Sequence, residues 1–310
     1  MSIIVLGSIN TVLLSQVEQL PGPGETFTSH SFSHFPGGKG ANQAVAAARL
    51  GLASHLISRV GNDNFGPHLT KLLHKQSIDV SNVGRDDKTP TGVAQRFVAA
   101  DGETITVITP GANHRIGRAE LAALDKLAPV ARILVLSLDI PIETILMAAR
   151  FGAQYGLTVI LDPNPVGEIP DELWDLVDVL TPDGAAASRL VGFPVESAEA
   201  AQHAAELLYG HGPRQIVLNR WGLGTHVVNA TDSRALLPYP NMPLDSSIAS
   251  DAFTGALAAG FSSGLSFIEA VHWGITASSI AMTRPHGLNT LPTRAELEML
   301  LATYQPDPFQ

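Results

Sequence analysis

The chain has 310 residues with 19 basic and 29 acidic side chains, which gives a formal net charge of −10. This acidic balance argues against nucleic-acid binding, because proteins that bind nucleic acid usually carry a basic face. The sequence contains no cysteine, so disulfides, thiolate catalysis and cysteine-bound zinc are excluded. The first residues lack a signal-peptide pattern, and no apolar run reaches the length of about 18 residues that a membrane span needs. We therefore expect a cytoplasmic protein.

Short apolar, β-branched runs alternate with segments of helical spacing along most of the sequence. The strand-like runs are Ile3–Leu6, His55–Val60, Ile133–Leu136, Leu157–Leu161, Val177–Leu180 and Ile216–Leu218. The helical segments include Ala41–Leu50, Ile142–Tyr155, Ala198–Tyr209, Ala252–Gly264 and Ser266–Met282. This alternation predicts an α/β fold, doubly wound, with a mostly parallel sheet flanked by helices. We expect one domain over residues 1–310, with ligands at the carboxyl ends of the strands.

Two segments, about 11–36 and 90–109, interrupt this alternation. They are rich in Thr, Ser, Phe and Val and show no helical period. The second segment alternates around Asp101-Gly102, which suits a type I′ hairpin. We expect the two segments to form a small β-sheet that stands away from the main core. A lid over a ligand cleft is one interpretation, and a plain β extension or a dimer contact is the other.

The first chemical motif is Gly37-Gly38-Lys39-Gly40-Ala41-Asn42, at the start of an Ala-rich helix. Glycines at such a point let backbone N–H groups approach a ligand, and the helix start adds a partial positive charge. Lys39 and Asn42 supply donors for hydroxyl groups or a phosphate. A tight loop without a ligand is the alternative. The motif is not a Walker A loop, because the G-x-x-x-x-G-K-[ST] pattern is absent.

The second motif is the polar stretch 245–251, which leads into a long helix whose first turn contains Asp251. A carboxylate at this position can cap the helix. It can also accept the proton of a hydroxyl group that attacks a phosphoryl group. The motif by itself leaves both interpretations open.

Together, the two motifs resemble those of the ribokinase-like (phosphofructokinase-B type) carbohydrate kinase family. The other matching pieces, in order, are Gly7-Ser8-Ile9-Asn10, Pro23-Gly24-Glu25, Val60–Gly66, Thr91-Gly92-Val93, Gly111-Ala112-Asn113, Leu180-Thr181-Pro182 and Asp251–Gly255. The resemblance covers nearly the whole chain and is greatest to the ribokinase branch. It implies ATP-dependent phosphoryl transfer to a hydroxyl of a small sugar, sugar derivative or nucleoside, with Mg²⁺ accompanying the ATP.

The resemblance also implies a set of site residues. Asp251 would be the catalytic base. The substrate would be bound by Asn10, Gly38, Lys39, Asn42 and Asp139. The anion hole and nucleotide site would comprise Ile248, Ala249, Ser250, Asp183, Gly222, Gly224 and Thr276. Asp245 and the carbonyl of Ser247 fall where the family holds a monovalent cation such as K⁺. The small β-sheet would cover the sugar and offer a surface for a homodimer.

The chain departs from the family pattern on both sides of the expected site. Ribokinases carry an Asp that binds ribose hydroxyls where this chain has Val12, which counts against ribose itself. On the nucleotide side, the unusual residues are Ala186 for Glu, Ser250 for Gly, Trp221 for Gly and Thr276 for His or Asn. These changes leave two alternatives open: a catalytically impaired relative that binds a small ligand without efficient ATP turnover, and a kinase that uses another phosphoryl donor.

Overall fold

The structure is a computed structural model and describes residues 2–239, 245–285 and 287–303. Its strands are β1 Ser2–Leu6, β2 Asn10–Val17, β3 Ser31–Gly37, β4 Ala53–Gly61, β5 Asp79–Asp86, β6 Gly92–Ala99, β7 Thr104–Thr109, β8 Ala131–Ser137, β9 Thr158–Asp162, β10 Val179–Leu180, β11 Gln215–Arg220, β12 Gly224–Val228 and β13 Ser233–Leu236. Its α-helices are α1 Lys39–Arg49, α2 Gly66–His74, α3 Arg118–Leu127, α4 Ile142–Tyr155, α5 Asp171–Asp175, α6 Gly184–Val191, α7 Ala198–Gly210, α8 Ala249–Ser262, α9 Phe267–Met282 and α10 Arg294–Thr303. Short 3₁₀ turns lie at Gly111–Arg115, Ala128–Val130 and Leu288–Thr290.

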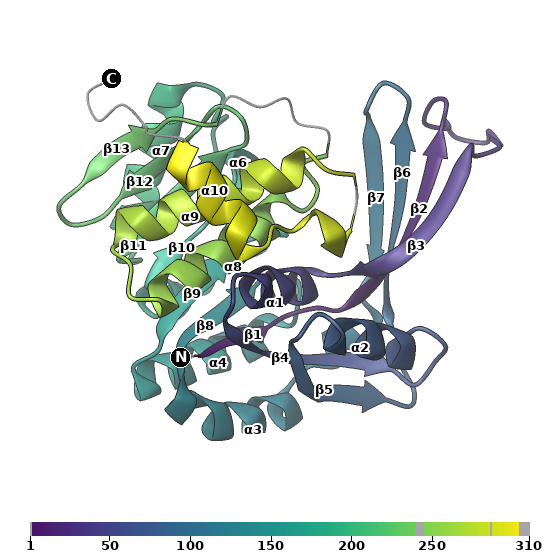
Figure 1. Ribbon diagram of the computed structural model, residues 1–310, viewed down its shortest axis with the longest axis horizontal. Helices are drawn as coiled ribbons and strands as arrows, with labels where there is room; N and C mark the ends of the chain where they lie inside the picture. The colour runs from purple at the N-terminus through teal and green to yellow at the C-terminus, as the bar shows by residue number, and fades with distance from the viewer. Residues whose placement is uncertain (1, 240–244, 286, 304–310) are drawn as a thin grey trace.

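A nine-stranded sheet in the order β13-β12-β11-β10-β9-β8-β1-β4-β5 forms the centre of the molecule (Figure 1). The strands from β11 to β5 pair in parallel, and β12 and β13 add an antiparallel edge. Alternate side chains of β1 point to opposite faces: Ile3 and Val5 pack with α1, α2, α8 and α9, whereas Ile4 and Leu6 pack with α3, α4 and α7. Because both faces are covered, the central strands are apolar throughout, as buried parallel strands generally are.

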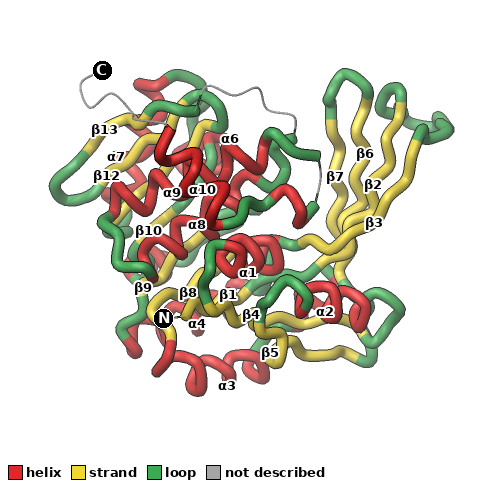
Figure 2. Tube along the Cα trace, viewed as in Figure 1, coloured by secondary structure: helices red, strands yellow, loops and turns green. Residues whose placement is uncertain are grey.

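A second sheet of four strands, in the order β3-β2-β6-β7, stands beside the main body (Figure 2). The β2 strand pairs antiparallel with β3 and parallel with β6, which brings the expected segments 11–36 and 90–109 together. The fold prediction, a mostly parallel sheet flanked by helices with a small separate sheet, is therefore confirmed by these pairings.

The turn between β6 and β7 differs from the predicted type I′ hairpin. The strands end at Ala99 and resume at Thr104, so four residues connect them instead of two. Gly102 has a φ of 91°, while Asp101 is not among the described residues with positive φ. A type I′ turn needs positive φ at both central residues, which costs Asp more than Gly. The longer loop confines this backbone conformation to the glycine.

Candidate active site

The candidate site lies where the carboxyl ends of three neighbouring strands meet the start of α8. The central sheet places β1 beside β8, and β8 beside β9. Ser8 follows β1, Asp139 follows β8, and Asp162 is the last residue of β9. The chain leaves β1 for the small sheet and returns through α1 to β4 on the other side of β1. Ligands bind at such reversals of strand order in open α/β sheets.

Asp251 lies in the first turn of α8 and is 3% exposed. Its carboxylate does not cap the helix, because the N-cap is Ile248 and no side chain caps this end. Instead it accepts hydrogen bonds from Lys39 Nζ at 3.0 Å and from Asn42 Nδ2 at 2.8 Å. Gln43 Nε2 is a third donor at 3.2 Å. All three donors come from α1, so the carboxylate bridges the two helices and is not a local cap.

Glycines make this meeting of α1 and α8 possible. A Cβ atom at Gly255 of α8 would lie 2.5 Å from the Cβ of Ala46 and 2.7 Å from the carbonyl oxygen of Gln43. The helices could not approach so closely with any larger residue. Gly38 precedes α1 with a φ of 97°, a conformation that other residues rarely adopt. The backbone turned in this way lets Lys39 begin the helix beside Ser8, whose hydroxyl accepts from the Lys39 N–H at 3.1 Å.

Lys39 connects Asp251 to a second buried carboxylate, that of Asp162. Its Nζ atom lies 2.8 Å from Asp162 Oδ2, and the Asp162 side chain is fully buried. Burial opposes the charge of Lys39, but the two carboxylates outweigh burial and hold its pKa well above the ordinary value. Burial raises the pKa of Asp251, against the opposing effect of Lys39, and does the same for Asp162. A buried aspartate with a raised pKa is a stronger proton acceptor than one in water.

A cavity of about 370 Å³ opens between this network and the small sheet. Gly38 and Asn42 line it from the α1 side, and Ile248 lines it from the start of α8. Asn42 uses its amide nitrogen on Asp251, while its Oδ1 atom is buried and has no partner among the described residues. A buried acceptor without a partner is costly unless a ligand supplies the donor. Asn42 can therefore accept a hydrogen bond from a substrate hydroxyl next to Asp251.

The small sheet forms the opposite wall of the cavity with Val12, Ala94 and Arg96. Val12 pairs in register with Ala94, so the two side chains lie on the same face of the sheet. Arg96 Nη2 donates to Asp245 Oδ1 at 3.1 Å, and the N–H of Ser247 donates to the same oxygen at 2.9 Å. Asp245, which the family resemblance places at a K⁺ site, is thus paired with the guanidinium of Arg96.

Three of the expected substrate-binding residues, Lys39, Asn10 and Asp139, are not among the residues that line this cavity. Asn10 is buried, and its Oδ1 atom accepts from Asn113 Nδ2 at 2.8 Å, which ties the start of β2 to the turn after β7. Asp139 accepts from the hydroxyl groups of Ser8 and Ser137. Burial raises the pKa of Asp139, so it is not a solvated carboxylate at a strand end.

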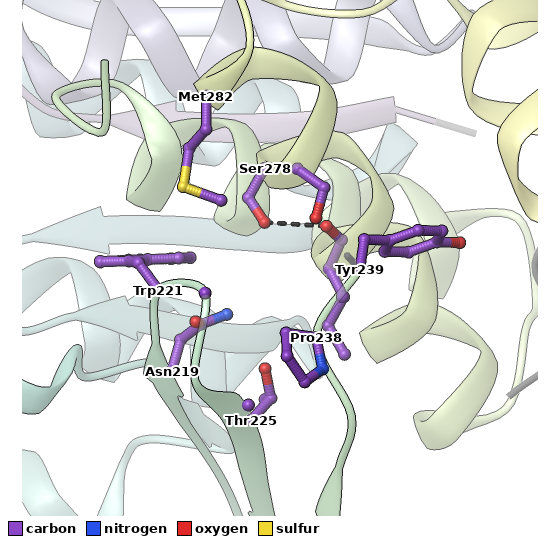
Figure 3. Close-up of a pocket in the computed structure, with 11 residues that line it drawn as sticks. Asn219, Trp221, Thr225, Pro238, Tyr239, Ser278 and Met282 are labelled. Carbon is purple, nitrogen blue, oxygen red and sulfur yellow. Dashed lines mark hydrogen bonds between the residues drawn. The ribbon is translucent and has the colours of Figure 1, made fainter. Parts of the chain in front are cut away.

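Among the expected nucleotide residues, Gly222, Gly224 and Asp183 line spaces other than the cavity. Gly222 and Gly224 line a closed pocket of only about 10 Å³, shown in Figure 3 with Trp221 and Met282 on one side and Tyr239 on the other. The indole ring of Trp221 meets Phe253 edge-on, with 6.1 Å between the ring centres. At this volume the pocket has no room for a nucleotide base.

A wider groove lies on the outer side of Trp221. It has a volume of about 550 Å³ and is lined in part by Asp183, Asn219 and Arg220. Asp183 caps α6 by accepting from the Ala186 N–H at 2.7 Å. Thr276 lies outside both spaces: its hydroxyl lies 2.8 Å from that of Tyr239 and is fully buried.

Sequence reasoning missed three residues of the site. Gln43 directly follows Asn42 in the glycine-rich motif. Asp162 ends a strand whose carboxyl end was expected to meet the ligand. Both positions were therefore signalled by the motif and by the topology. The sequence indicated a site role for Arg96 less clearly, because its place on the cavity face, beside Ala94, becomes evident only from the strand pairing. Its contact with Asp245 spans 149 residues and could not be read from spacing.

Comparison with known proteins places the chain in a family. The sequence pattern described as pfkB family carbohydrate kinase matches residues 1–294. The chain belongs to this family. Ribokinase of Haemophilus influenzae is 32% identical over 299 residues, covering 96% of this chain and 97% of that protein. The crystal structure of ribokinase from Thermotoga maritima has a TM-score of 0.88 at 31% identity, and the match covers 97% of this chain and 99% of the other.

A ribokinase from Arabidopsis thaliana, solved with ribose and ATP, has a TM-score of 0.87 at 27% identity and matches 97% of this chain and 98% of its own. The predicted family, the fold and the class of enzyme, a carbohydrate kinase, are confirmed by the pfkB match. Nothing in these matches favours the alternative of a relative that has lost ATP turnover. No helix in the described part of the chain has the length and apolar character needed to cross a membrane.

Proposed function

We propose that this pfkB family member transfers the terminal phosphoryl group of ATP to a hydroxyl of a small sugar derivative, with Asp251 as the base. The observation that carries the proposal is the pairing of a buried carboxylate with an unsatisfied acceptor. Asn42 donates to Asp251 through its nitrogen and presents an unpartnered oxygen at the cavity wall. A hydroxyl bound by Asn42 is held beside the group that takes its proton.

The charges around Asp251 suit this chemistry. The substrate hydroxyl loses its proton to Asp251 as its oxygen bonds to the terminal phosphorus, and the bond from that phosphorus to the ADP oxygen breaks. Lys39 Nζ lies 3.2 Å from Ser250 Oγ and 3.0 Å from Asp251, so its positive charge lies at the start of α8. The first N–H groups of a helix have no partners within the helix, and they favour negative charge. They can stabilise the phosphoryl group as it is transferred.

In this proposal, ATP and Mg²⁺ bind in the groove on the outer side of Trp221. Asp183 is a carboxylate of the groove lining, and Asn219 and Arg220 supply polar groups beside it. Mg²⁺ commonly binds one or two carboxylates together with nucleotide phosphates, and the groove lining offers two, those of Asp183 and Glu196. Mg²⁺ would neutralise charge on the phosphates. The described residues contain no cluster of three or more metal-binding side chains that could hold an ion without the nucleotide.

Asp245 and Ser247 do not fit the K⁺ site that the family resemblance implies. Asp245 Oδ1 already accepts from the Arg96 guanidinium and from the Ser247 N–H. Arg96 supplies the positive charge that a cation would bring, and a second cation at the same oxygen would be repelled. We therefore include no K⁺ in the proposed reaction.

The small sheet is proposed to act as a lid and as a dimer contact. It provides one wall of the cavity through Val12, Ala94 and Arg96. Its outer strands leave large apolar side chains exposed: Phe32 is 61% exposed, and Ile108 is 54% exposed. The β7 strand is also an unpaired edge, which invites pairing with another strand. A second copy of the chain would cover these groups. A cytoplasmic setting, where ATP is available, belongs to the same proposal.

The test is ADP release by Asp251→Asn compared with the unaltered protein, with Mg-ATP and a panel of sugars and sugar derivatives. The variant keeps the size of the side chain but removes the base, so we expect turnover to fall by a factor of about 10² to 10⁴. Asp171→Asn is the matched control, because Asp171 is an exposed aspartate in the first turn of α5. Undiminished turnover in Asp251→Asn would refute the assignment.

A further inference from the structure

Arg96 is the one charged residue among the described residues that line the cavity. It lies on β6, two residues after Ala94 and on the same face of the small sheet. The small-sheet wall around it is mostly apolar, with Val12, Phe35 and Ala94, and its polar member is Thr106, which pairs in register with Arg96. A guanidinium in such a place is partly desolvated: the Arg96 side chain is only 15% exposed. Burying a charge in an apolar wall costs free energy unless hydrogen-bond partners or a ligand compensate for the lost water.

The contacts of Arg96 leave part of its guanidinium group free. Its Nη2 atom donates to Asp245, but its Nε atom is buried and has no partner in the part of the chain that the structure describes. Arginine has five N–H donors in a planar fork, so one bond to Asp245 does not exhaust them. The hydrogen bond to Asp245 anchors the group through Nη2, and the Nε donor remains for another acceptor.

The neighbours of Arg96 indicate what that acceptor is. Val12 gives the lid wall an apolar surface and no acceptor for sugar hydroxyls. A guanidinium prefers anionic oxygens, to which it makes short, charge-assisted and often paired hydrogen bonds. The cavity therefore offers a cationic donor from the lid and, from α1, the Oδ1 acceptor of Asn42.

We infer that the substrate is an anionic sugar derivative whose carboxylate or phosphate group binds Arg96 while its reacting hydroxyl binds Asn42. This assignment rests on the proposed kinase function and narrows its substrate class. The anionic group stays unchanged in the reaction. The hydroxyl oxygen gains the phosphoryl group, its proton passes to Asp251, and ADP leaves. Arg96 determines which substrates are held with their hydroxyl beside the base.

The first experiment measures ADP release with sugar acids, sugar phosphates and the matching neutral sugars. The probes are gluconate, ribonate and glucuronate, glucose 6-phosphate and ribose 5-phosphate, and glucose and ribose, in a buffer free of phosphate and carboxylates. We expect kcat/KM for one anionic class to exceed that of its neutral partners by about 10- to 100-fold, as a charge-assisted hydrogen bond supplies. Comparison of the sugar acids with the sugar phosphates shows whether Arg96 binds a carboxylate or a phosphate group.

The second experiment uses Arg96→Gln and Arg96→Lys, with Gln95→Ala as the matched control. Gln95 is exposed and, as the neighbour in the same strand, points to the opposite face. Arg96→Gln should remove most of the preference for the anionic class, because kcat/KM for the anionic probes should fall much further than kcat/KM for the neutral sugars. Arg96→Lys should retain part of the preference, because the charge remains without the fork. Thermal unfolding of each variant checks that the fold is intact.

Calorimetric binding of the same probes without ATP separates this inference from the proposed function. Binding of an anionic probe that Arg96→Gln weakens about tenfold supports the inference, even if no probe is turned over. ADP release with neutral sugars that equals or exceeds release with anionic ones overturns the inference and leaves the kinase function standing. Binding of anionic probes that is unaffected by Arg96→Gln also overturns it. Absence of turnover with every probe counts against the proposed function alone.

Discussion

The ammonium nitrogen of Lys39 lies 2.8 Å from a carboxylate oxygen of Asp162, a residue that is fully buried at the end of β9. The same nitrogen lies 3.0 Å from Asp251, so a single lysine is shared between two aspartates. Gln43 Nε2 also joins them, donating to Asp162 at 3.0 Å and to Asp251 at 3.2 Å. Asp162 is therefore placed to set the strength of the base without touching the substrate.

Asp162→Asn should weaken Asp251 as a base. Burial raises the pKa of Asp251, so its charged, proton-accepting form is lost as the pH falls through a higher value than for an exposed aspartate. Without the negative charge of Asp162, Lys39 pairs with Asp251 only, and Asp251 loses a negatively charged neighbour. Both effects lower the pKa of Asp251. The acid limb of the kcat/KM profile should move to lower pH, and the plateau rate should fall roughly tenfold.

Asp178→Asn is the control for that profile, because Asp178 directly precedes β10 and pairs with Arg214 at 3.1 Å, outside the site. Its profile should match that of the unaltered protein. An Asp162→Asn profile whose acid limb stays in place, with only a lower plateau, would show that Asp162 does not act through the charge of Asp251.

The nucleotide region yields a prediction for Trp221. It lines, with Gly222 and Gly224, a pocket of about 10 Å³. Trp221→Gly should open this pocket and lower the KM for ATP by roughly tenfold, equivalent to about 1.4 kcal/mol of binding free energy. Leu207→Ala, on α7 and 42% exposed in the native chain, should leave the KM unchanged. A higher KM in Trp221→Gly would mean that the indole stacks on the base.

Much of the fold followed from the alternation of apolar runs, because buried parallel strands leave a clear pattern. The expected helix Ile142–Tyr155 has the bounds of α4. The β5 strand, Asp79–Asp86, was missed because no residue in it is fully buried, so its sequence lacks an apolar run. The edge strands β12 and β13 were also missed, and β13 is too short and too exposed to stand out.

The site was predicted where a contact is encoded locally. Gly38, Lys39 and Asn42 share one helix start, and the placement of Asp251 beside them followed from the family resemblance. The ion pair of Arg96 with Asp245 could not be predicted, because it depends on how the small sheet folds over the start of α8. Long-range contacts of this kind are set by tertiary packing and leave no periodic signal.

The same ion pair predicts that turnover does not depend on K⁺. Replacing K⁺ by tetramethylammonium should leave the rate of the unaltered protein unchanged, because Arg96 already neutralises Asp245. Arg96→Ala should make the rate rise with K⁺, since the Asp245 carboxylate, which loses this guanidinium, and the Ser247 carbonyl are oxygen ligands suited to a hard cation. The measured quantity is the ratio of rates with and without K⁺ for each variant. Strong activation of the unaltered protein by K⁺ would contradict the assignment.

Glu296 at the start of α10 gives a prediction about stability. It accepts from Arg284 Nη2 at 2.5 Å and from the Thr293 N–H at 2.7 Å. The Arg284 hydrogen bond, with that of Thr293, lowers the pKa of Glu296 to about 2. A depressed pKa stabilises the fold above the unfolded-state value of about 4.3, and this contribution is lost as the pH falls from there toward 2.

Glu296→Gln should therefore lower the free energy of unfolding at pH 7 by about 1 kcal/mol, a modest figure because the side chain is 38% exposed and solvent screens the pair. Urea unfolding at pH 7, 5 and 3.5 measures the difference from the unaltered protein, which should shrink toward the lowest pH because the native carboxylate loses its advantage there. Glu298→Gln, which removes an exposed partner of Arg294, should change stability less at every pH. A Glu296→Gln deficit that stays constant with pH would mean that the effect comes from lost packing and hydrogen bonding, not from the charge.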